Sequence, residues 1–255
     1  MMIHETAVID SSAQLGENVS VGPYTCIEGD VKIGDGCKIG PQVTIMKHTT
    51  LGRDCQVHSG AVLGDIPQDT GFKGYDSFVE IGDSCIIREG VTIHRGTEEG
   101  SNTVIGDGCF LMAFSHFAHN VKLGDGVIAA NGVLLAGYVE VGPKAFLSGN
   151  AVVHQFVKIG RLVMLGGGCG VSKDVPPFCT VRPVSLNDVA GINAVGMKRS
   201  GMDRADLAQV KQAFKELYKS GKNVSQALAD LEQEFSDGPV MEMIDFIKAA
   251  ERGIC

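Results

Sequence analysis

A six-residue repeat of aliphatic residues constrains this sequence more than any other feature. The repeat keeps one phase from Ile3 to Val171. An α-helix has 3.6 residues per turn and a strand has a period of two, so neither produces this spacing. A period of six is typical of a parallel β-helix. The residues on the repeat are Ile3, Ile9, Leu15, Val21, Ile27, Ile33, Ile39, Ile45, Leu51, Val57, Leu63, Ile81, Ile87, Ile93, Ile105, Leu111, Phe117, Leu123, Ala129, Leu135, Val141, Leu147, Val153, Ile159, Leu165 and Val171.

A second register lies two residues before the large aliphatic one and holds small side chains, such as Val31 and Cys37. Residues i and i−2 of a strand point to the same side, so each repeat sends one small and one larger side chain inward. Three such strands close a coil of about 18 residues, and stacked coils share one core. We expect the Gly in Leu15-Gly16 and Ile33-Gly34 to give the corner backbone freedom. The general crossover rule favours a right-handed path.

The composition fits a thin-cored solenoid. The chain has no Trp and 34 Gly, and its net charge is −8. The first residues, 1–5, are neither basic nor continuously apolar, and no later stretch is long enough to cross a bilayer. We therefore expect a cytoplasmic protein with no transmembrane segment and no nucleic-acid partner.

Five of the eight cysteines are expected to be packing residues. They occupy the small inward register, where a free Cys behaves as a small hydrophobic residue. No Cys-x-x-Cys pair is present, so the usual zinc and redox spacings are absent. We expect neither a metal nor a cofactor. The five are Cys37, Cys55, Cys85, Cys109 and Cys169.

The repeat ends at Asp174-Val175-Pro176-Pro177, and from about residue 191 the pattern becomes helical. We predict a β-helix domain over residues 1–190 and a helical domain over 191–255. One amphipathic helix is expected over 203–219, with Asp203 as N-cap and Gly221 as the stop, and two more near 224–235 and 239–251.

The first helix of this domain carries a basic stripe beside its apolar face. One interpretation is a solvated helix edge. The other is a docking surface for an acidic partner, which an acidic protein must provide locally. The stripe consists of Arg204, Lys211, Lys215 and Lys219.

Two interruptions of the repeat are the first places to look for function. They predict excursion loops at residues 65–78 and 95–103, and they put Asp69, Tyr75 and Glu99 on positions that otherwise hold small or aliphatic residues. Adding 18 to His119 gives Gly137, and adding 18 again gives Gln155. A Gly stacked on a surface His leaves room for a ligand, although histidines also occur at solvated corners without function. The predicted corner column consists of His94-Arg95, His119, Gly137 and His154-Gln155, with His116 beside it on the outer side of the strand.

At these residues the chain resembles the UDP-N-acetylglucosamine O-acyltransferases of lipid A biosynthesis, nearly from end to end. The resemblance implies a homotrimer of left-handed β-helices with active sites between subunits. It also implies transfer of a 3-hydroxyacyl chain from acyl carrier protein to the 3-position of a UDP-amino sugar, the first step of that pathway. The motifs that carry it are Pro67-Gln68-Asp69, Thr92-Ile93-His94-Arg95-Gly96-Thr97, His116-Phe117-Ala118-His119, Leu135-Ala136-Gly137, Val153-His154-Gln155-Phe156, Asp174-Val175-Pro176-Pro177 and Gly196-Met197-Lys198-Arg199.

The resemblance also implies a role for each matching residue. A His of near-neutral pKa suits the removal of a hydroxyl proton, and a fixed backbone N–H suits an oxyanion. Two of these residues also have interpretations that involve no function: Asp69 as a loop turn residue and Arg199 as a surface charge. The implied roles are His119 as general base, the Gly137 N–H as oxyanion donor, Gln68, Asp69 and His116 at the sugar, His154 and Gln155 at the substrate with Gln155 on the pyrophosphate, Asn193 and Arg199 near the nucleotide, and Gly167 at the acyl chain.

The sequence departs from the family pattern in four places. Asn120 replaces the Asp that commonly orients the base, and Tyr138 replaces a His after the oxyanion Gly. Gly71 replaces a Lys, and the segment 182–187 has about one extra residue. These departures leave acyl-chain length and the choice between O- and N-acyl transfer to a UDP-3-amino sugar open.

Three other functions fit the repeat less well. The N-acyltransferase of the same pathway has a uridine-binding domain before its β-helix, and here the repeat begins at Ile3. A zinc carbonic anhydrase of the same fold needs three converging His, and the spacing of His116 and His119 with His94 or His154 does not match it. Ice-binding and scaffolding solenoids have repetitive outer faces, whereas the outward positions here vary.

Overall fold

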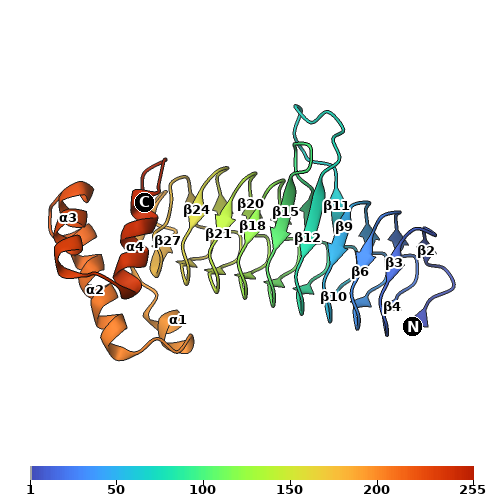
Figure 1. Ribbon diagram of the computed structural model, residues 1–255, viewed down its shortest axis with the longest axis horizontal. Coiled ribbons are helices and arrows are strands. Elements are labelled where there is room, and N and C mark those ends of the chain that lie inside the picture. Colours follow the sequence, from blue (N-terminus) through green and yellow to red (C-terminus); the bar gives the residue numbers. More distant parts are fainter. Residues whose placement is uncertain (1) are drawn as a thin grey trace.

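The computed structural model describes residues 2–255. It is a straight, three-sided parallel β-helix with a cluster of helices at its C-terminal end (Figure 1). The chain runs from sheet 1 to sheet 2 to sheet 3 in every coil, so each strand pairs in parallel with the strand one coil away. Lys38 of one coil, for example, pairs with Ser20 below it and Gln56 above it.

The strands are mostly two residues long, and each sheet is named for its place in the coil. Sheet 1 contains β1 (Met2–Ile3), β4 (Ser20–Val21), β7 (Lys38–Ile39), β10 (Gln56–Val57), β13 (Ile86–Ile87), β16 (Phe110–Leu111), β19 (Ile128–Ala129), β22 (Phe146–Leu147), β25 (Met164–Leu165), β27 (Cys179–Arg182) and the antiparallel β28 (Asp188–Ile192). Sheet 2 contains β2 (Val8–Ile9), β5 (Cys26–Ile27), β8 (Thr44–Ile45), β11 (Val62–Asp65), β14 (Thr92–His94), β17 (His116–Phe117), β20 (Leu134–Leu135), β23 (Val152–Val153) and β26 (Gly170–Val171). Sheet 3 contains β3 (Gln14–Leu15), β6 (Lys32–Ile33), β9 (Thr49–Leu51), β12 (Phe78–Ile81), β15 (Asn102–Ile105), β18 (Lys122–Leu123), β21 (Glu140–Val141) and β24 (Lys158–Ile159).

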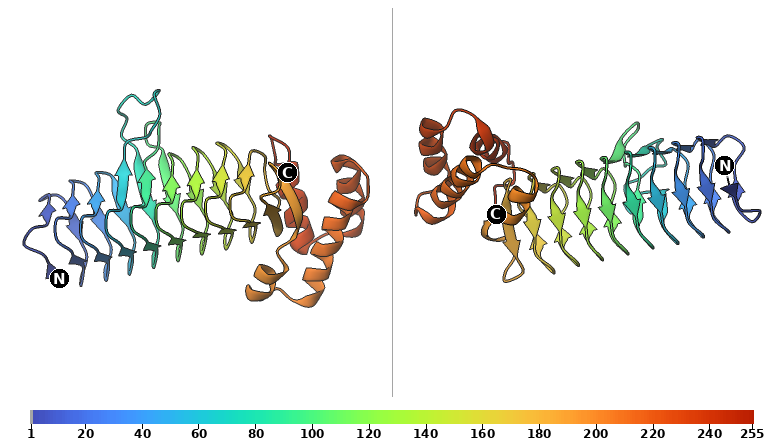
Figure 2. Two further views of the ribbon diagram at one scale, coloured as in Figure 1. Left: turned by 180° about the vertical axis from the view of Figure 1, so that it is seen from behind. Right: turned by 90° about the horizontal axis from the view of Figure 1, so that it is seen from below.

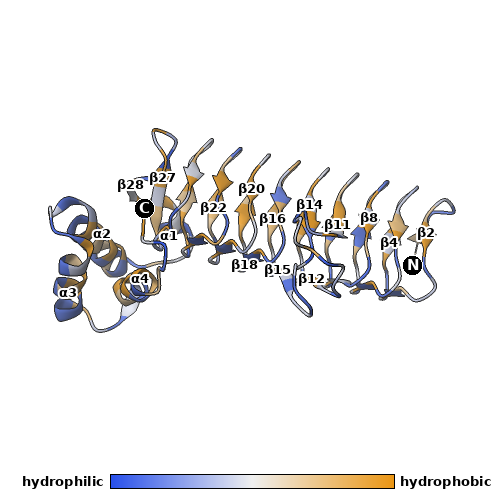
Figure 3. Ribbon diagram, turned by 90° about the horizontal axis from the view of Figure 1, so that it is seen from above, coloured by the Kyte–Doolittle hydropathy of each residue, from blue (hydrophilic) through white to orange (hydrophobic). Residues whose placement is uncertain are grey.

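The core is a single apolar column along the axis of the β-helix, as the two registers predicted. From Val19 onward the inward aliphatic residues and their small partners are buried, up to Val181. Figure 3 shows the resulting apolar positions along the strands. The five cysteines predicted to pack are buried, and the thiols of Cys55 and Cys85 donate to backbone carbonyls one coil away at 3.1 Å.

The Gly that follows the aliphatic residue is required for a different reason from the one predicted. The left-handed backbone conformation falls two residues later, at positions such as Asn18 and Gly36. Gly34 instead needs the absence of a Cβ, because a Cβ there would come within 2.7 Å of the Gly52 carbonyl carbon in the next coil. The expectation that backbone freedom selects this Gly was therefore wrong; close approach of the coils selects it.

The two interruptions leave the β-helix at the same corner, between sheet 2 and sheet 3. They lengthen the spacing between paired coils to 30 and 24 residues, in place of the usual 18. Both added lengths are multiples of six, so the repeat resumes in phase. The first excursion links β11 to β12 and the second links β14 to β15, and the first stands out from the side of the β-helix (Figure 2). The strands take in Asp65, Phe78, Asn102 and Thr103 from the ends of the predicted loops.

Four helices follow the hairpin of β27 and β28: α1 (Ala194–Arg199), α2 (Arg204–Lys219), α3 (Val224–Glu234) and α4 (Gly238–Lys248). Asp203 caps α2 by accepting from the Asp206 N–H, as predicted, and Asn223 forms a capping box for α3. The short α1 was not predicted as a separate element. The last β-strand ends at Ile192, close to the predicted domain boundary at residue 190. The boundary itself stays a prediction.

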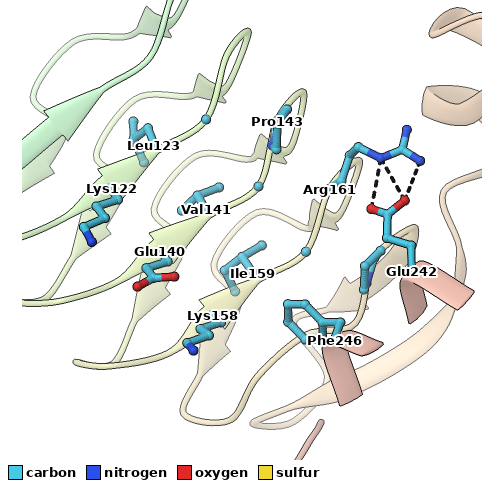
Figure 4. Close-up of a pocket in the computed structure, with 14 residues that line it drawn as sticks. Lys122, Leu123, Glu140, Val141, Pro143, Lys158, Ile159, Arg161, Glu242 and Phe246 are labelled. Atoms are coloured by element: carbon cyan, nitrogen blue, oxygen red, sulfur yellow. Dashed lines mark hydrogen bonds and ion pairs between the residues drawn. The ribbon is translucent and has the colours of Figure 1, made fainter. Parts of the chain in front are cut away.

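An ion pair joins the helical domain to the β-helix. The guanidinium of Arg161 binds the Glu242 carboxylate of α4 at 2.7 Å and lies over the ring of Phe178. A groove of about 500 Å³ runs beside this pair, between sheet 3 and α4 (Figure 4). It lies away from the excursion corner. Among the described helices, none has the length and apolar character that a membrane span requires.

Replacement of a buried inward Cys tests the packing of the core. Cys85→Ala should lower the free energy of unfolding by about 1 kcal/mol, because a small side chain still fits the register. Cys85→Leu should cost about 1–3 kcal/mol through overpacking. Urea denaturation of both variants measures the difference. Complete unfolding of Cys85→Ala would show that the thiol does more than pack.

Candidate active site

The sheet 2–sheet 3 corner gathers the polar groups, and the coil register places them above one another. The Tyr138 N–H donates to the His119 carbonyl at 3.0 Å, and the Phe156 N–H donates to the Gly137 carbonyl at 3.0 Å. On the strand before the corner, His116 pairs with Thr92 below it. The predicted column is therefore present within one subunit.

His119 lies at the centre of this corner with its imidazole 13 % exposed. Its Nδ1 is 3.0 Å from Oδ1 of Asn120, and its Nε2 is 3.9 Å from a carboxylate oxygen of Asp69 on the first excursion. The 3.9 Å gap leaves Nε2 without a hydrogen-bond partner in the described chain. Nε2 therefore faces a carboxylate and is free to take a proton from a substrate.

Gly137 is essential to the position of His119. A Cβ at Gly137 would collide with the Cε1, Nε2 and Nδ1 atoms of the imidazole. The amide N–H of Gly137 donates to no acceptor within residues 2–255, whereas its carbonyl is used by Phe156. The residue packed against the ring of the candidate base therefore has an unbonded backbone N–H.

Two other histidines near the corner, His94 and His116, are held neutral. Burial, and then the neighbouring His94, lower the pKa of His116 to about 4, and burial lowers the pKa of His94. His116 also shares a 2.7 Å hydrogen bond between Nδ1 and the Thr92 hydroxyl. A lowered pKa makes an imidazole a weaker base, so these two rings suit hydrogen bonding to a substrate better than base catalysis.

The first excursion brings Gln68 and Asp69 to the corner. Asp69 accepts a 2.7 Å hydrogen bond from the Gly71 N–H, which orients its other carboxylate oxygen. Phe72 of the same loop lies under the guanidinium of Arg95, 5.7 Å from ring centroid to Cζ. This contact ties the first excursion to the second. Gln68 is exposed, and no hydrogen bond of its side chain holds it in the described structure.

His154 and Gln155 lie one coil beyond Gly137 and are exposed. Phe156, next to them, stacks on Tyr138 with ring centroids 4.9 Å apart. Tyr138 in turn meets the His119 ring edge-on at 5.2 Å. The residues that continue the column are thus available to a ligand that extends from His119 toward the C-terminal end.

The structure does not bring the other predicted residues to this corner within one subunit. Asn193 and Arg199 line a cavity of about 490 Å³ over sheet 1, beside Ile128, Phe146 and Met164. The Asn193 amide caps α1 and donates to the Leu162 carbonyl at 2.9 Å, so much of its hydrogen bonding is internal.

Gly167 lies at the corner between sheet 1 and sheet 2, and the basic stripe lies on α2. The roles of Gly167 and of the stripe residues stay predictions.

Sequence reasoning missed Thr97. It belongs to an excursion, where coil arithmetic assigns no neighbours, yet its backbone N–H and hydroxyl both donate to Asn120, at 3.1 and 3.0 Å. Its position inside a motif of the family resemblance was the one signal available.

Comparison with known proteins identifies the family. A model described as UDP-N-acetylglucosamine O-acyltransferase, domain 2, matches residues 174–255, and bacterial transferase hexapeptide models match 12–47, 30–65 and 102–137. An acyl-[acyl-carrier-protein]--UDP-N-acetylglucosamine O-acyltransferase of Sulfurihydrogenibium sp. is 50% identical over 99% of this chain and 93% of its own length. The chain belongs to the UDP-N-acetylglucosamine O-acyltransferase family.

Solved structures of family members share the whole fold. The UDP-N-acetylglucosamine acyltransferase from Bacteroides fragilis is 39% identical, with a TM-score of 0.95 over 100% of both chains. That of Francisella novicida is 35% identical, with a TM-score of 0.95 over 99% of this chain and 93% of its own. The predicted fold class, a left-handed parallel β-helix with a C-terminal helical domain, is confirmed.

A catalytic zinc site needs at least three protein ligands close together. No group of three His, Cys, Asp or Glu side chains among residues 2–255 is arranged to hold a metal ion. His94 and His116 are neighbours, with ring centroids 5.0 Å apart, and both rings are already packed against other groups.

Replacement of Gly137 tests the geometry of this corner. Gly137→Ala should displace the His119 imidazole and lower kcat about 100-fold, with a smaller effect on KM, because the added methyl occupies the place of the ring. Steady-state kinetics measures the effect, and circular dichroism checks that the β-helix is intact. The matched control is Gly191→Ala on β28, where an added Cβ meets no atom of the described chain within 4 Å; it should keep full activity. A fully active Gly137→Ala enzyme would contradict the close stacking on His119.

Proposed function

We propose that this protein transfers a 3-hydroxyacyl chain from acyl carrier protein to the 3-hydroxyl of UDP-N-acetylglucosamine, with His119 as general base. The relatives' names state the donor and acceptor, and the free Nε2 of His119 beside the unbonded Gly137 N–H is the observation that supports the chemistry. We also propose that this reaction is the first step of lipid A biosynthesis and takes place in the cytoplasm.

The reaction needs two proton transfers and one oxyanion donor. Nε2 of His119 removes the proton of the sugar hydroxyl while that oxygen attacks the thioester carbon. The Gly137 N–H stabilises the oxyanion of the tetrahedral intermediate. Collapse of the intermediate breaks the carbon–sulfur bond, and the imidazolium returns its proton to the thiolate of the carrier. The residues themselves provide the base and the oxyanion donor, so the proposal assigns no role to a metal or cofactor.

The sugar is expected to lie between the first excursion and His119. Asp69, 3.9 Å from Nε2, and Gln68 provide acceptors and donors for its hydroxyl groups, and the neutral His116 provides another. His154 and Gln155 then lie in the direction of the diphosphate, with Gln155 as the pyrophosphate contact. A 3-amino sugar would present a cation to Asp69. N-acyl transfer is therefore the alternative, and product analysis must distinguish it from O-acyl transfer.

The outer faces of the β-helix support a homotrimer. Sheet 3 presents mostly charged and polar side chains, whereas the successive strands β13 to β25 of sheet 1, and β11, β20 and β23 of sheet 2, present apolar ones. Two different apolar faces pair most simply in a head-to-tail ring, in which sheet 1 of one subunit covers sheet 2 of the next. The apolar outward residues are Ile86, Phe110, Ile128, Phe146 and Met164 on sheet 1, and Val62, Leu134 and Val152 on sheet 2.

Such a ring would also explain why the predicted residues are divided within one subunit. The cavity with Asn193 and Arg199 lies over sheet 1, and His116 and His119 lie on or beside sheet 2. When sheet 1 of a neighbour faces sheet 2, these two groups approach the same cleft, and Asn193 and Arg199 can serve the nucleotide.

The acyl chain would then run toward Gly167, near the hairpin of β27 and β28. A Cβ on Gly170 there would lie 3.1 Å from Leu186 Cδ1. A Cβ on Gly167 would meet one atom within 4 Å, the Gly149 carbonyl oxygen at 3.5 Å. The bare Gly167 therefore leaves room, which favours a longer chain.

The carrier protein is proposed to dock on α2. Arg204, Lys211 and Lys215 are exposed and form no ion pair within residues 2–255, which leaves their charge available to the acidic carrier.

Loss of the base is the direct test of the function. His119→Ala should lower acyl transfer from acyl carrier protein by about 1,000-fold while the protein stays folded. Mass spectrometry of products from UDP-N-acetylglucosamine and its 3-amino analogue, with carriers of several chain lengths, measures activity and acceptor together. Substantial turnover by His119→Ala would remove the base assignment, and a product from the 3-amino sugar alone would establish the N-acyl alternative.

Charge reversal on α2 tests the docking surface. Lys211→Glu with Lys215→Glu should raise KM for acyl carrier protein about tenfold at low salt and leave KM for the sugar unchanged, because only the carrier contact is lost. Arg204→Glu should add to this effect. The matched control is Lys32→Glu with Lys122→Glu on sheet 3, which changes the same net charge far from α2. Equal KM values in the two variants would leave the stripe as solvated surface.

A further inference from the structure

The side chain of Asn120 connects the candidate base to the second excursion. Oδ1 of Asn120 lies 3.0 Å from Nδ1 of His119, 3.1 Å from the backbone N of Thr97 and 3.0 Å from the Thr97 hydroxyl. Asn120 is 7% exposed, so water does not compete freely for this oxygen. Its own N–H donates to the buried Thr103 hydroxyl at 2.8 Å, which fixes its backbone.

The direction of each hydrogen bond follows from the chemistry of the groups. A backbone N–H can only donate, so the amide atom facing Thr97 N is the oxygen. An amide oxygen can only accept, so Nδ1 of His119 must carry a proton, and the lone pair of the neutral ring is then on Nε2. The Thr97 hydroxyl donates to Asn120, so the Tyr138 hydroxyl, 2.9 Å away, can give Thr97 its single proton; the competing acceptor for that proton, Oε1 of Glu98, is farther away, at 3.4 Å.

We propose that Asn120, supported by Thr97 and Tyr138, is a positioning residue that fixes His119 in the Nδ1–H tautomer without placing a negative charge beside it. This inference rests on the proposed function for its catalytic meaning, but the tautomer itself does not depend on activity. Asn120 and Tyr138 stand where the family commonly has Asp and His, and one hydroxyl, that of Thr97, connects them. The two departures thus form one network.

The neutral acceptor has a consequence for the pH dependence of the reaction. A carboxylate at position 120 would stabilise the imidazolium, so the base would become protonated at a higher pH. With Asn120 the imidazolium gains no ion pair on its Nδ1 side. We therefore expect the enzyme to keep an unprotonated base, and its activity, to lower pH than an Asn120→Asp variant.

Other ionisable groups also face His119 and stay the same in this comparison. Asp69 of the first excursion faces Nε2 at 3.9 Å, and Glu98 of the second lies behind Tyr138, 3.4 Å from its hydroxyl. Arg95 and the neutral His94 lie in the coil below, and His154 lies two coils above. Because all are present in both proteins, a difference between them reports position 120.

Nitrogen-15 spectra of the full-length protein labelled at histidine test the tautomer directly. The signals of His119 are assigned by their absence from the spectrum of His119→Gln. They should show a protonated Nδ1 and an unprotonated Nε2. Asn120→Ala should lose this preference, whereas Asn120→Asp should keep it. A wild-type spectrum with the proton on Nε2 would overturn the proposal, whether or not the enzyme transfers acyl chains.

The pH profile of kcat/KM provides the second measurement. Asn120→Asp should move the acidic limb up by about one pH unit with similar activity at its optimum. Asn120→Ala should lower kcat about 10- to 100-fold with little change in KM for the sugar. Tyr138→Phe, which keeps the ring and removes the hydroxyl, should show a smaller loss in kcat.

An unmoved acidic limb in a folded Asn120→Asp enzyme would contradict the inference. If the wild-type protein showed the predicted tautomer but no acyl transfer, the result would contradict the proposed function and support the hydrogen-bond network.

Discussion

The coil-to-coil pairing of the backbone is the constraint on which the rest of the structure depends. Apart from the antiparallel β28, the strands are hydrogen-bonded in parallel to the strands one coil away, with inward residues stacked on inward residues. A shift by one residue would turn the apolar set outward, so the buried column holds the register fixed. Residues at equal places in successive coils therefore form columns, and a functional group in one coil has defined neighbours in the next.

The excursions use this constraint to build a site on a surface that is otherwise regular. Because they add multiples of six residues, the core continues unchanged beneath them, and only the sheet 2–sheet 3 corner is altered. The first excursion adds Asp69, and the second adds Thr97, to a column that already holds His119 and Gly137. In the proposed site, chemistry arises where irregular segments meet a rigid register, which fixes the distances that catalysis needs.

The sequence predicts much of this fold because a single period dominates it. The inward registers, the burial of Cys37 or Cys85 and the stacking of Gly137 on His119 all follow from counting. The hand of the helix does not follow, because the general crossover rule favours the opposite one. The sequence also does not predict why Gly34 is required, because the distance between Gly34 and the next coil is set by the packing of the coils.

Apart from what the family resemblance implied, such as Asp69, the candidate site was predictable only where the register applies. Thr97 lies in an excursion, so counting gives it no neighbours, and its bonds to Asn120 depend on how that loop folds. Asn193 and Arg199 belong to the helical end, whose placement over sheet 1 has no periodic signal. In the proposed ring, their relation to His119 depends on contacts between subunits.

A structure of the protein with bound UDP-N-acetylglucosamine tests the central claim most directly, because that claim is a statement about one corner. The account predicts the sugar 3-hydroxyl within hydrogen-bonding distance of His119 Nε2, with Asp69 on the sugar and Gln155 toward the diphosphate. A sugar bound instead in the groove between sheet 3 and α4, distant from His119, would contradict it.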